Sequence, residues 1–374
     1  MVDFSFSDEQ QMLLETTRRF VADHYGVEQR RAVMSTAEGY SSSIWRQFAE
    51  LGLLGLNVPE EHGGLDGGSI GTLLVSMALG EALIVEPYLS SAVLATRAIA
   101  KLGSPAQRSE WLPKLASGGL LAVLAHEERG TRHSQSAIET HATSTGSGWI
   151  LSGRKAVVYH APIADLLLIS ARAKDAAGDA WGLFAVPRVS AGVKLQAFTT
   201  VDGQRAADVV LDEVKIDAAA RIGGNVIAEL PAVLDYGVCA LCSEAVGVMD
   251  RLLAVTVEYT RARVQFGVPI GRFQALQHRM ADMLTHVEQS RSMAYLAASR
   301  CESDAPAERA AAISAAKVVI GRAARFVGQQ AVQLHGGMGV TDELPVSHYF
   351  KRLLAFELRF GSTEAHLERY GCYL

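Results

Sequence analysis

The chain has 374 residues, of which 49% are hydrophobic and 20% charged, which is enough apolar material for two or three domains. Its 35 lysines and arginines face 40 acidic residues, so the formal net charge of −5 gives no overall attraction to nucleic acid or to an anionic membrane. The first ten residues carry acids where an export or transit peptide carries basic residues, and no apolar run reaches membrane-spanning length. We therefore expect a globular cytoplasmic protein with neither a membrane nor a nucleic acid as partner.

The four cysteines are too few for a disulfide framework in so long a chain. Cys239 and Cys242 form a C-x-x-C pattern inside a strongly helical segment, where they would share one face of the helix. No second Cys or His pair stands at zinc spacing. The pattern indicates a buried apolar face, and no metal site is predicted.

Residues 1–118 read as a run of helices. Ser7 can cap a first helix whose opening turn is acidic. A second helix around Trp45 ends at Gly52, where the segment LGLNVPEEHGGLDGG predicts an irregular loop. Further helices are predicted over residues 72–80, 88–101 and 104–115.

The pattern changes at Gly118. Seven short runs rich in β-branched or aromatic residues follow, divided by turns such as residues 146–148 and 175–179. They predict a middle domain of β structure, either a barrel or a sandwich.

Helices return after Gly223, and an apolar stripe with steps of four and three residues runs from Leu234 to Tyr259. The stripe resumes at Phe273 beyond a short turn, and a further helix ends at the glycine-rich residues 335–339. These stripes predict an antiparallel four-helix bundle. The expected fold class is α+β, with an N-terminal all-α domain (1–118), a middle β-barrel or sandwich domain (119–222) and a C-terminal four-helix bundle (223–374).

The short turn between the two long helices, residues 266–271, has Arg263 at one end and Arg272 at the other. Helix ends leave backbone N–H groups unpaired, and a guanidinium offers a planar donor fork for phosphate oxygens, so the turn could bind an anion. An ordinary helix hairpin with solvated arginines is the simpler interpretation of these residues on composition alone.

With this turn, the order helices, strands, helices resembles the acyl-CoA dehydrogenase family along the whole chain. The segments that match family segments in order and spacing are FSDEQQMLLETTRRF, AELGLLGLNVPEEHGG, SGRKAVVYHAPIADLLL, YTRARVQFGVPIGRFQALQHRMADM and QAVQLHGGMGVTDELPVSHYFKR. The resemblance implies the family's fold with bound FAD, usually in a tetramer whose subunits share the sites. It also implies α,β-dehydrogenation of an acyl-CoA thioester to a trans-2-enoyl-CoA, with an electron-transferring flavoprotein as acceptor.

The resemblance implies that residues in and beside the turn contact FAD. Arg263 matches the family arginine that binds the FAD pyrophosphate, and Phe266 and Gln274 match residues that lie against the adenine end. An arginine is suited to this because it neutralises phosphate. With the family in view, Arg263 is predicted to bind the cofactor and Arg272 to be a solvated charge at a helix end.

A second FAD contact is implied further along the chain. Residues 333–339 match the family pattern Gln-x-x-Gly-Gly-x-Gly, which meets the adenosine part of FAD from a neighbouring subunit. Gln333, Gly336 and Gly337 are the residues carried over, since glycines let a backbone come close to a ligand.

The catalytic base of the family is missing at both of its known positions. Many members carry a glutamate directly before a Gly-Thr near the C-terminus, and here Phe360 occupies that position. A subset carries the base on the long helix before the turn, where Gly237 stands. Asp235 matches a family carboxylate associated with CoA, whereas Val238 replaces an arginine used in this region.

The strand domain departs from the family at the flavin. Residues 126–134 replace the usual Thr-Glu-Pro-x-x-Gly-Ser-Asp segment, although Lys155 is retained. Val157 replaces an aromatic residue that covers the flavin, and Tyr159 replaces a threonine near its reactive edge. His126 and Glu127 are possible polar site residues or ordinary loop contacts.

Two carboxylates could replace the missing base. Glu364 lies one helical turn after Phe360, but an exposed or capping glutamate is the simpler interpretation. Glu244 lies in the buried stripe and is not expected to be ionised there without a partner.

FAD motifs combined with a missing base resemble the small subunit of heteromeric family members such as pimeloyl-CoA dehydrogenase. This implies a heterotetramer in which a paired chain supplies the catalytic glutamate. Two alternatives stay open: a self-sufficient homotetramer that uses Glu364 or another carboxylate, and a non-catalytic structural subunit that binds neither flavin nor thioester. The sequence does not indicate the acyl chain.

Overall fold

The computed structural model describes residues 6–130, 137–175 and 178–373. These residues form two compact units. One unit contains the described residues up to Ala32, the segment Ser69–Ile84 and the residues from Val238 onward, and the other contains Val33–Gly68 and Val85–Gly237. The predicted boundaries of three domains at residues 118 and 222 stay a prediction.

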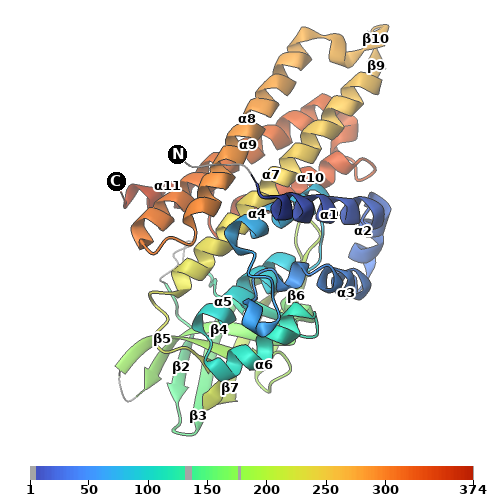
Figure 1. Ribbon diagram of the computed structural model, residues 1–374. Helices are drawn as coiled ribbons and strands as arrows, with labels where there is room; N and C mark the ends of the chain where they lie inside the picture. Colours follow the sequence, from blue (N-terminus) through green and yellow to red (C-terminus); the bar gives the residue numbers. More distant parts are fainter. Residues whose placement is uncertain (1–5, 131–136, 176–177, 374) are drawn as a thin grey trace. The chain divides into compact units, whose positions relative to one another are not determined.

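The first unit is helical (Figure 1). Its helices are α1 (Asp8–His24), the start of α2 (Val27–Ser35), most of α4 (Gly68–Glu81) and α7 (Leu230–Ala262), α8 (Gln274–Arg300), α9 (Pro306–His335), α10 (Pro345–Leu358) and α11 (Thr363–Gly371). The Ser7 cap is confirmed, because its hydroxyl accepts from the Gln10 N–H and the Gln10 side chain accepts from the Ser7 N–H. The C-terminal part is a helical domain as predicted, with α11 as a short fifth helix packed on α9.

Helices α4 and α7 cross at glycines. A Cβ atom on Gly247 would lie 2.0 Å from the Met77 carbonyl oxygen, and one on Gly80 would lie 2.3 Å from the Glu244 carbonyl oxygen. Any larger side chain at either glycine would meet the backbone of the other helix. The two helices therefore pack backbone to backbone at this crossing.

The second unit begins with short helical elements: α3 (Ser42–Glu50), η1 (Leu53–Gly55), η2 (Glu60–His62), η3 (Tyr88–Ala95), α5 (Thr96–Leu102) and α6 (Pro105–Ala116). The glycine-rich segment after Gly52 is not wholly irregular, since η1 and η2 are single 3₁₀ turns. The helix predicted over residues 88–101 starts as the π-helix η3 and continues as α5. The π-helical spacing is set by Thr96, whose N–H and hydroxyl both donate to the Ser91 carbonyl five residues earlier.

One eight-stranded sheet forms the rest of this unit. Its strands are β1 (Ala122–Ala125), β2 (His141–Ser144), β3 (Gly148–Tyr159), β4 (Leu166–Asp175), β5 (Gly178–Pro187), β6 (Val193–Thr199), β7 (Arg205–Asp217) and β8 (Arg221–Ile222). Their order is β6-β7-β3-β2-β4-β5-β8, and β1 pairs with β4 in parallel. The predicted middle β domain is confirmed as a sheet around one core cluster that includes Trp149 and Phe184, while the tip of the predicted turn at 176–177 lies outside the described residues.

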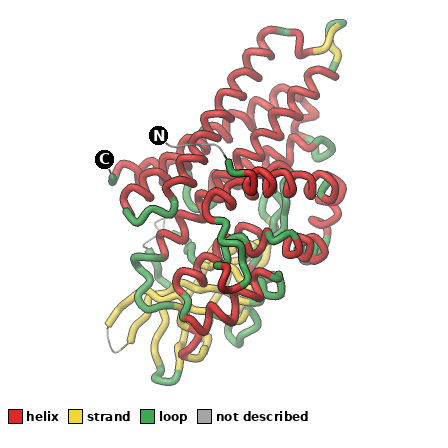
Figure 2. Tube along the Cα trace, in the orientation of Figure 1, coloured by secondary structure: helices red, strands yellow, loops and turns green. Residues whose placement is uncertain are grey.

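Outside this sheet, the described strands are β9 (Val264–Gln265) and β10 (Val268–Pro269), at the end of the α7 and α8 hairpin (Figure 2). The apolar stripe of α8 is buried only from Met283 onward, whereas Phe273 near the hairpin end is exposed. The prediction that this stripe is chiefly core therefore holds from Met283 onward and not at Phe273. None of the described helices combines the length and apolar character needed to cross a bilayer.

Candidate functional site

The predicted pyrophosphate contact lies at the end of the α7 and α8 hairpin. Arg263 follows the last residue of α7, and its carbonyl accepts from the Ile270 N–H at 2.8 Å, which closes the hairpin. Phe266 and Gly267 form the two-residue turn between β9 and β10 with positive φ angles of 54° and 78°. The Phe266 side chain is 91% exposed, and Arg263 is exposed beside it. The turn thus presents a guanidinium and an aromatic ring to the outside of this unit.

Gln274 is the first residue of α8 and is exposed. Phe273 precedes it without a side-chain cap, so the first N–H groups of α8 have no capping side chain. Arg272 is also exposed, on the other side of the same turn. Exposed amide and guanidinium donors beside an uncapped helix start are suited to contacts with an anionic or polar ligand.

The second predicted FAD segment follows the end of α9. Gln333 is exposed, and Gly336 and Gly337 have no atom within 4 Å of the place where a Cβ would stand. Next to them, the His335 ring stacks on Tyr259 of α7 with 4.2 Å between ring centroids. Burial lowers the pKa of His335, partly opposed by its hydrogen bond to the Ala331 carbonyl.

This stack links the two predicted FAD segments. Tyr259 lies one helical turn before Arg263, and His335 directly precedes Gly336. The ring contact therefore brings the ends of α7 and α9 to the same end of the helical unit. The glycines leave an open surface there that a ligand could approach.

The loop between α10 and α11 holds Phe360 at the expected base position. Phe360 has a φ of 59° and the following Gly361 a φ of 107°, so the loop makes a sharp left-handed turn. Its shape is fixed from both sides. The Glu357 carboxylate accepts from the Thr363 N–H at 2.8 Å and from the Thr363 hydroxyl at 2.9 Å, and His366 Nε2 donates to the Phe360 carbonyl at 2.9 Å.

Glu364 does not approach this position as a buried base would. It is exposed in the first turn of α11. A backbone N–H and the Ser362 hydroxyl hold its pKa below the usual value. A glutamate with these contacts is ionised at neutral pH, and its environment is that of a helix-start carboxylate.

The alternative base position on α7 is occupied by Gly237 and lies against the Leu94 side chain. A Cβ on Gly237 would lie 2.4 Å from Leu94 Cδ2. Asp235, two residues earlier, is fully buried within the same unit. Its side chain is enclosed by this unit, and its contact with CoA stays a prediction.

Glu244 is held by a partner that the sequence alone did not indicate. Its Oε1 lies 2.5 Å from Arg352 Nη1, and both side chains are largely buried. Arg352 also donates to the Ile84 carbonyl at 2.9 Å. The partner that an ionised Glu244 requires is thus present, because α10 supplies an arginine 108 residues further along the chain.

The retained Lys155 lies in a buried polar cluster of the strand unit. Its Nζ is 2.6 Å from Glu128 Oε1 and donates to the Ser170 hydroxyl at 3.1 Å. Glu128 also accepts from the Thr140 hydroxyl at 2.6 Å, while His126 Nδ1 lies 3.0 Å from the same Ser170 hydroxyl. The polar side chains of this cluster thus form hydrogen bonds with one another.

Glu128 is not among the predicted site residues, although the sequence carries a signal for it. After β1, His126 and Glu128 are buried and Glu127 is less buried, which is the alternation of an extended chain. That alternation turns Glu128 inward towards Lys155. Residues 131–134 of the predicted flavin segment lie outside the described residues.

Val157 lies at an irregularity of β3. The register with β7 shifts between Lys155 and Val158, and Val157 has a φ of 49° with its side chain exposed. The Asp208 carboxylate fixes this bulge by accepting from the Val157 N–H at 3.1 Å and from Arg129 at 2.6 Å. Burial opposes ionisation of Asp208, yet these donors hold its pKa below the usual value.

The thiols of the C-x-x-C pattern are buried on α7. A contact with Cys301, followed by burial, raises the pKa of Cys239, and burial raises the pKa of Cys242 to about 12. Among the residues that the structure describes, no group of three or more His, Cys, Asp or Glu side chains could hold a metal ion.

Three protein-family models match the sequence of this chain. They are the N-terminal domain of acyl-CoA dehydrogenase over residues 7–119, its middle domain over 124–217 and its C-terminal domain over 230–371. The chain therefore belongs to the acyl-CoA dehydrogenase family.

Among known relatives, the acyl-CoA dehydrogenase FadE27 of Mycobacterium tuberculosis is 32% identical over 351 residues, covering 92% of this chain and 91% of the relative. A variant of the Tcur3481-Tcur3483 steroid ACAD superposes with a TM-score of 0.89 at 31% identity, covering 98% of this chain and 97% of that one. The ChsE4-ChsE5 complex from Mycobacterium tuberculosis superposes with a TM-score of 0.89 at 30% identity, covering 99% and 98%.

Proposed function

We propose that this chain binds FAD and serves in the α,β-dehydrogenation of an acyl-CoA thioester as the base-lacking subunit of a heteromeric complex. The observation that carries the proposal is Phe360 at the base position of a loop whose shape is fixed by hydrogen bonds. When bound, FAD supplies an acceptor for the hydride from the β carbon. A carboxylate must take the proton from the α carbon, and Phe360 has no atom that can do so.

The described residues fit FAD at its adenosine and pyrophosphate end. Arg263 and Gln274 are exposed donors on either side of one tight turn. Gly336 and Gly337 face open space and have no side chains, so a ligand can approach their backbone closely. In this proposal Arg263 binds the pyrophosphate, Phe266 and Gln274 contact the adenine end, and Gln333 and the two glycines contact the adenosine of a neighbouring subunit.

The three other candidate positions support a base less well than a paired chain does. Gly237 carries no side chain that could accept a proton, and the Leu94 side chain lies beside it. Glu244 is committed to Arg352. Glu364 has the exposed position and lowered pKa of a helix-start carboxylate.

A second chain is supported by two further observations. Two similar solved structures carry the names of two proteins, Tcur3481-Tcur3483 and ChsE4-ChsE5. The hairpin end of this chain also exposes Val264 and Phe266, and the segment after α9 exposes Met338 and Val340. Exposed apolar side chains grouped at one end of a unit are typical of a subunit interface.

Co-expression tests the proposal. The chain is purified alone and together with a family member that carries the usual glutamate, and the flavin absorbance and enoyl-CoA formation are measured for both preparations. We expect turnover only from the co-purified pair. Stoichiometric FAD with rapid enoyl-CoA formation by this chain alone would overturn the need for a partner.

A self-sufficient homotetramer with Glu364 as base is a second candidate, since Glu364 is ionised and lies four residues after Phe360. In that case Glu364→Gln abolishes bleaching of the flavin by substrate, whereas Glu368→Gln, which changes another exposed glutamate of the same helix, does not. Unchanged bleaching rejects Glu364. A purified protein without a flavin spectrum would instead indicate the non-catalytic structural subunit.

Electron transfer to an electron-transferring flavoprotein and a cytoplasmic location are parts of the same proposal. The electron transfer rests on the family reaction, which leaves a reduced flavin that must be reoxidised. Anaerobic mixing of the substrate-reduced complex with an oxidised electron-transferring flavoprotein is expected to restore the oxidised flavin spectrum of the complex.

A further inference from the structure

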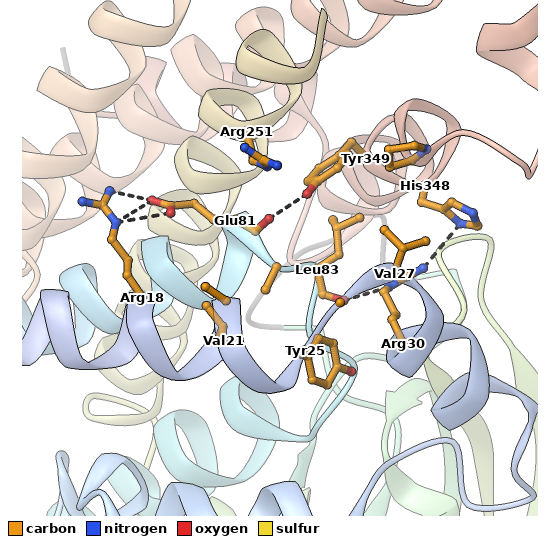
Figure 3. A pocket seen from close by; sticks show the side chains of 14 residues that line it. Arg18, Val21, Tyr25, Val27, Arg30, Glu81, Leu83, Arg251, His348 and Tyr349 are labelled. Atoms are coloured by element: carbon orange, nitrogen blue, oxygen red, sulfur yellow. Dashed lines mark hydrogen bonds and ion pairs between the residues drawn. The ribbon is translucent and has the colours of Figure 1, made fainter. Parts of the chain in front are cut away.

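A cavity of about 460 Å³ lies within the helical unit, apart from every residue predicted to contact FAD (Figure 3). It is lined by residues of α1 and α2, the end of α4, α7 and α10. Cavities of 300 to 1,000 Å³ are of the size that holds small ligands, and 460 Å³ falls within that range.

One wall of the cavity is fixed by a bidentate ion pair. The Arg18 guanidinium donates to both Glu81 carboxylate oxygens, with Nη2 at 2.6 Å from Oε1. The Tyr349 hydroxyl of α10 donates to the Glu81 carbonyl at 2.7 Å. Glu81 is thereby neutralised and held on both its side chain and its backbone.

The opposite wall is built around a buried arginine. Arg30 is 4% exposed, and its Nε donates to the Leu83 carbonyl at 2.8 Å. Its Nη1 lies 3.4 Å from His348 Nδ1. Because a guanidinium can only donate, Nδ1 must be an acceptor, and Nε2 then donates to the Asp342 carbonyl at 3.2 Å. His348 is therefore neutral, in agreement with the lowering of its pKa by burial.

Arg251 of α7 extends into the cavity and is exposed (Figure 3). Its guanidinium lies beside the Tyr349 hydroxyl, where it partly opposes the rise in the Tyr349 pKa that burial causes. The lining contains three arginines and one carboxylate, so with His348 neutral the cavity has an excess of two positive charges. Val21, Val27 and Leu83 supply apolar surface beside these charges.

From this geometry we propose that the cavity binds a small organic anion, a carboxylate or phosphate joined to an apolar body. Arg251 donates to the anionic group, and Arg30 adds positive charge in a partly enclosed space where electrostatic attraction is stronger than in water. The apolar body lies against the valine and leucine side chains. This site is separate from the proposed dehydrogenase chemistry and does not depend on it.

Isothermal titration calorimetry on the purified protein tests the site, with the flavin absorbance recorded in parallel. The probes are benzoate, phenyl phosphate and the neutral benzyl alcohol, which share one apolar body. We expect both anions or one of them to bind at least tenfold more tightly than benzyl alcohol. The better of the two anions identifies a carboxylate or a phosphate as the preferred group.

Variants locate the binding. Arg251→Gln is expected to weaken the bound anion about tenfold or more, which is the range for loss of a charge-assisted hydrogen bond. Val27→Asp, which adds a negative charge at the cavity, is expected to weaken it as well. Arg19→Gln is the matched control, because Arg19 is the exposed neighbour of Arg18 and does not line the cavity.

Three results would overturn the site. They are equal binding of benzyl alcohol and the anions, unchanged anion binding in Arg251→Gln and Val27→Asp, and no heat of binding from either anion at about 10 mM. Because titration and flavin spectrum are recorded on the same sample, loss of the cavity proposal and loss of the FAD proposal are told apart.

Discussion

Lys155 and Glu128 form an ion pair inside the strand unit, with 2.6 Å between Nζ and Oε1 and side chains 0% and 4% exposed. Burial lowers the pKa of Lys155 to about 8, opposed by the Glu128 charge. Burial also disfavours the Glu128 carboxylate, but Lys155, Thr140 and the Glu139 N–H together hold its pKa below the usual value. Each charge thus partly offsets the cost of burying the other.

Removing one partner is therefore expected to cost more than removing both. Lys155→Met leaves Glu128 buried without its counterion, and we expect the free energy of unfolding to fall by about 3–5 kcal/mol. The double variant Lys155→Met with Glu128→Leu should recover most of that loss. Urea unfolding followed by circular dichroism measures both. The control is Lys194→Met, which breaks an exposed ion pair with Asp212 and should lower the free energy of unfolding by less than about 1 kcal/mol. A similarly small loss in Lys155→Met would contradict the prediction.

The same pair predicts a dependence of stability on pH. The pKa of Lys155 is about 8 in the folded protein against an ordinary value of 10.5, so between these pH values the unfolded chain binds more protons. The free energy of unfolding must then rise with pH, by about 3 kcal/mol in total from this group. We expect the difference between the natural protein and the double variant to grow from pH 8 to 10.5. A constant difference over that interval would show that Lys155 keeps its ordinary pKa.

Arg263→Gln is expected to weaken FAD binding about 10- to 100-fold, since it removes charge-assisted hydrogen bonds to phosphate. The measurement is titration of the apoprotein with FAD by flavin fluorescence. Arg272→Gln removes the exposed arginine at the other side of the same turn and should leave the affinity unchanged. Equal loss in the two variants would mean that only the general charge of the turn matters.

Phe360→Glu is expected to restore a base within this chain. Because the loop is held by Glu357 and His366 through groups other than the Phe360 side chain, its shape should persist in the variant. Flavin bleaching by acyl-CoA should then be about 100-fold faster or more than in Phe360→Gln, whose amide side chain has a similar size and shape but cannot act as a base. Stopped-flow absorbance compares the two, and identical rates would reject Phe360 as the base position.

Gly247→Ala is expected to destabilise the helical unit by about 2 kcal/mol or more. Alanine raises helix propensity by about 1 kcal/mol, but its Cβ would lie 2.0 Å from the Met77 carbonyl oxygen, and a backbone atom cannot move aside cheaply. Gly371→Ala at the end of α11, with no atom within 4 Å, is the control and should change stability by less than about 0.5 kcal/mol. Thermal unfolding measures both, and a stabilised Gly247→Ala would show that α4 and α7 can separate.

The sequence predicted much of the fold because many of its signals are local. Ser7 and Ser104 cap helices within three residues of themselves, and the glycines after His335 end α9 where the pattern indicates. The order of the helical and strand segments, and the residues of five family segments, pointed to the family before any contact was known. Even the missing base is visible in the sequence, because position 360 is defined by its neighbours Gly361 and Ser362.

Only the tertiary structure decided which residues share a site. Glu128 pairs with Lys155 across 27 residues and Glu244 pairs with Arg352 across 108, and a charge carries no sequence signal for a partner at such a distance. The same holds for Tyr259 and His335, for the exposure of the hairpin end, and for the arginines around the cavity. A helix cap is a contact within one turn, whereas these contacts exist only after the chain has folded back on itself.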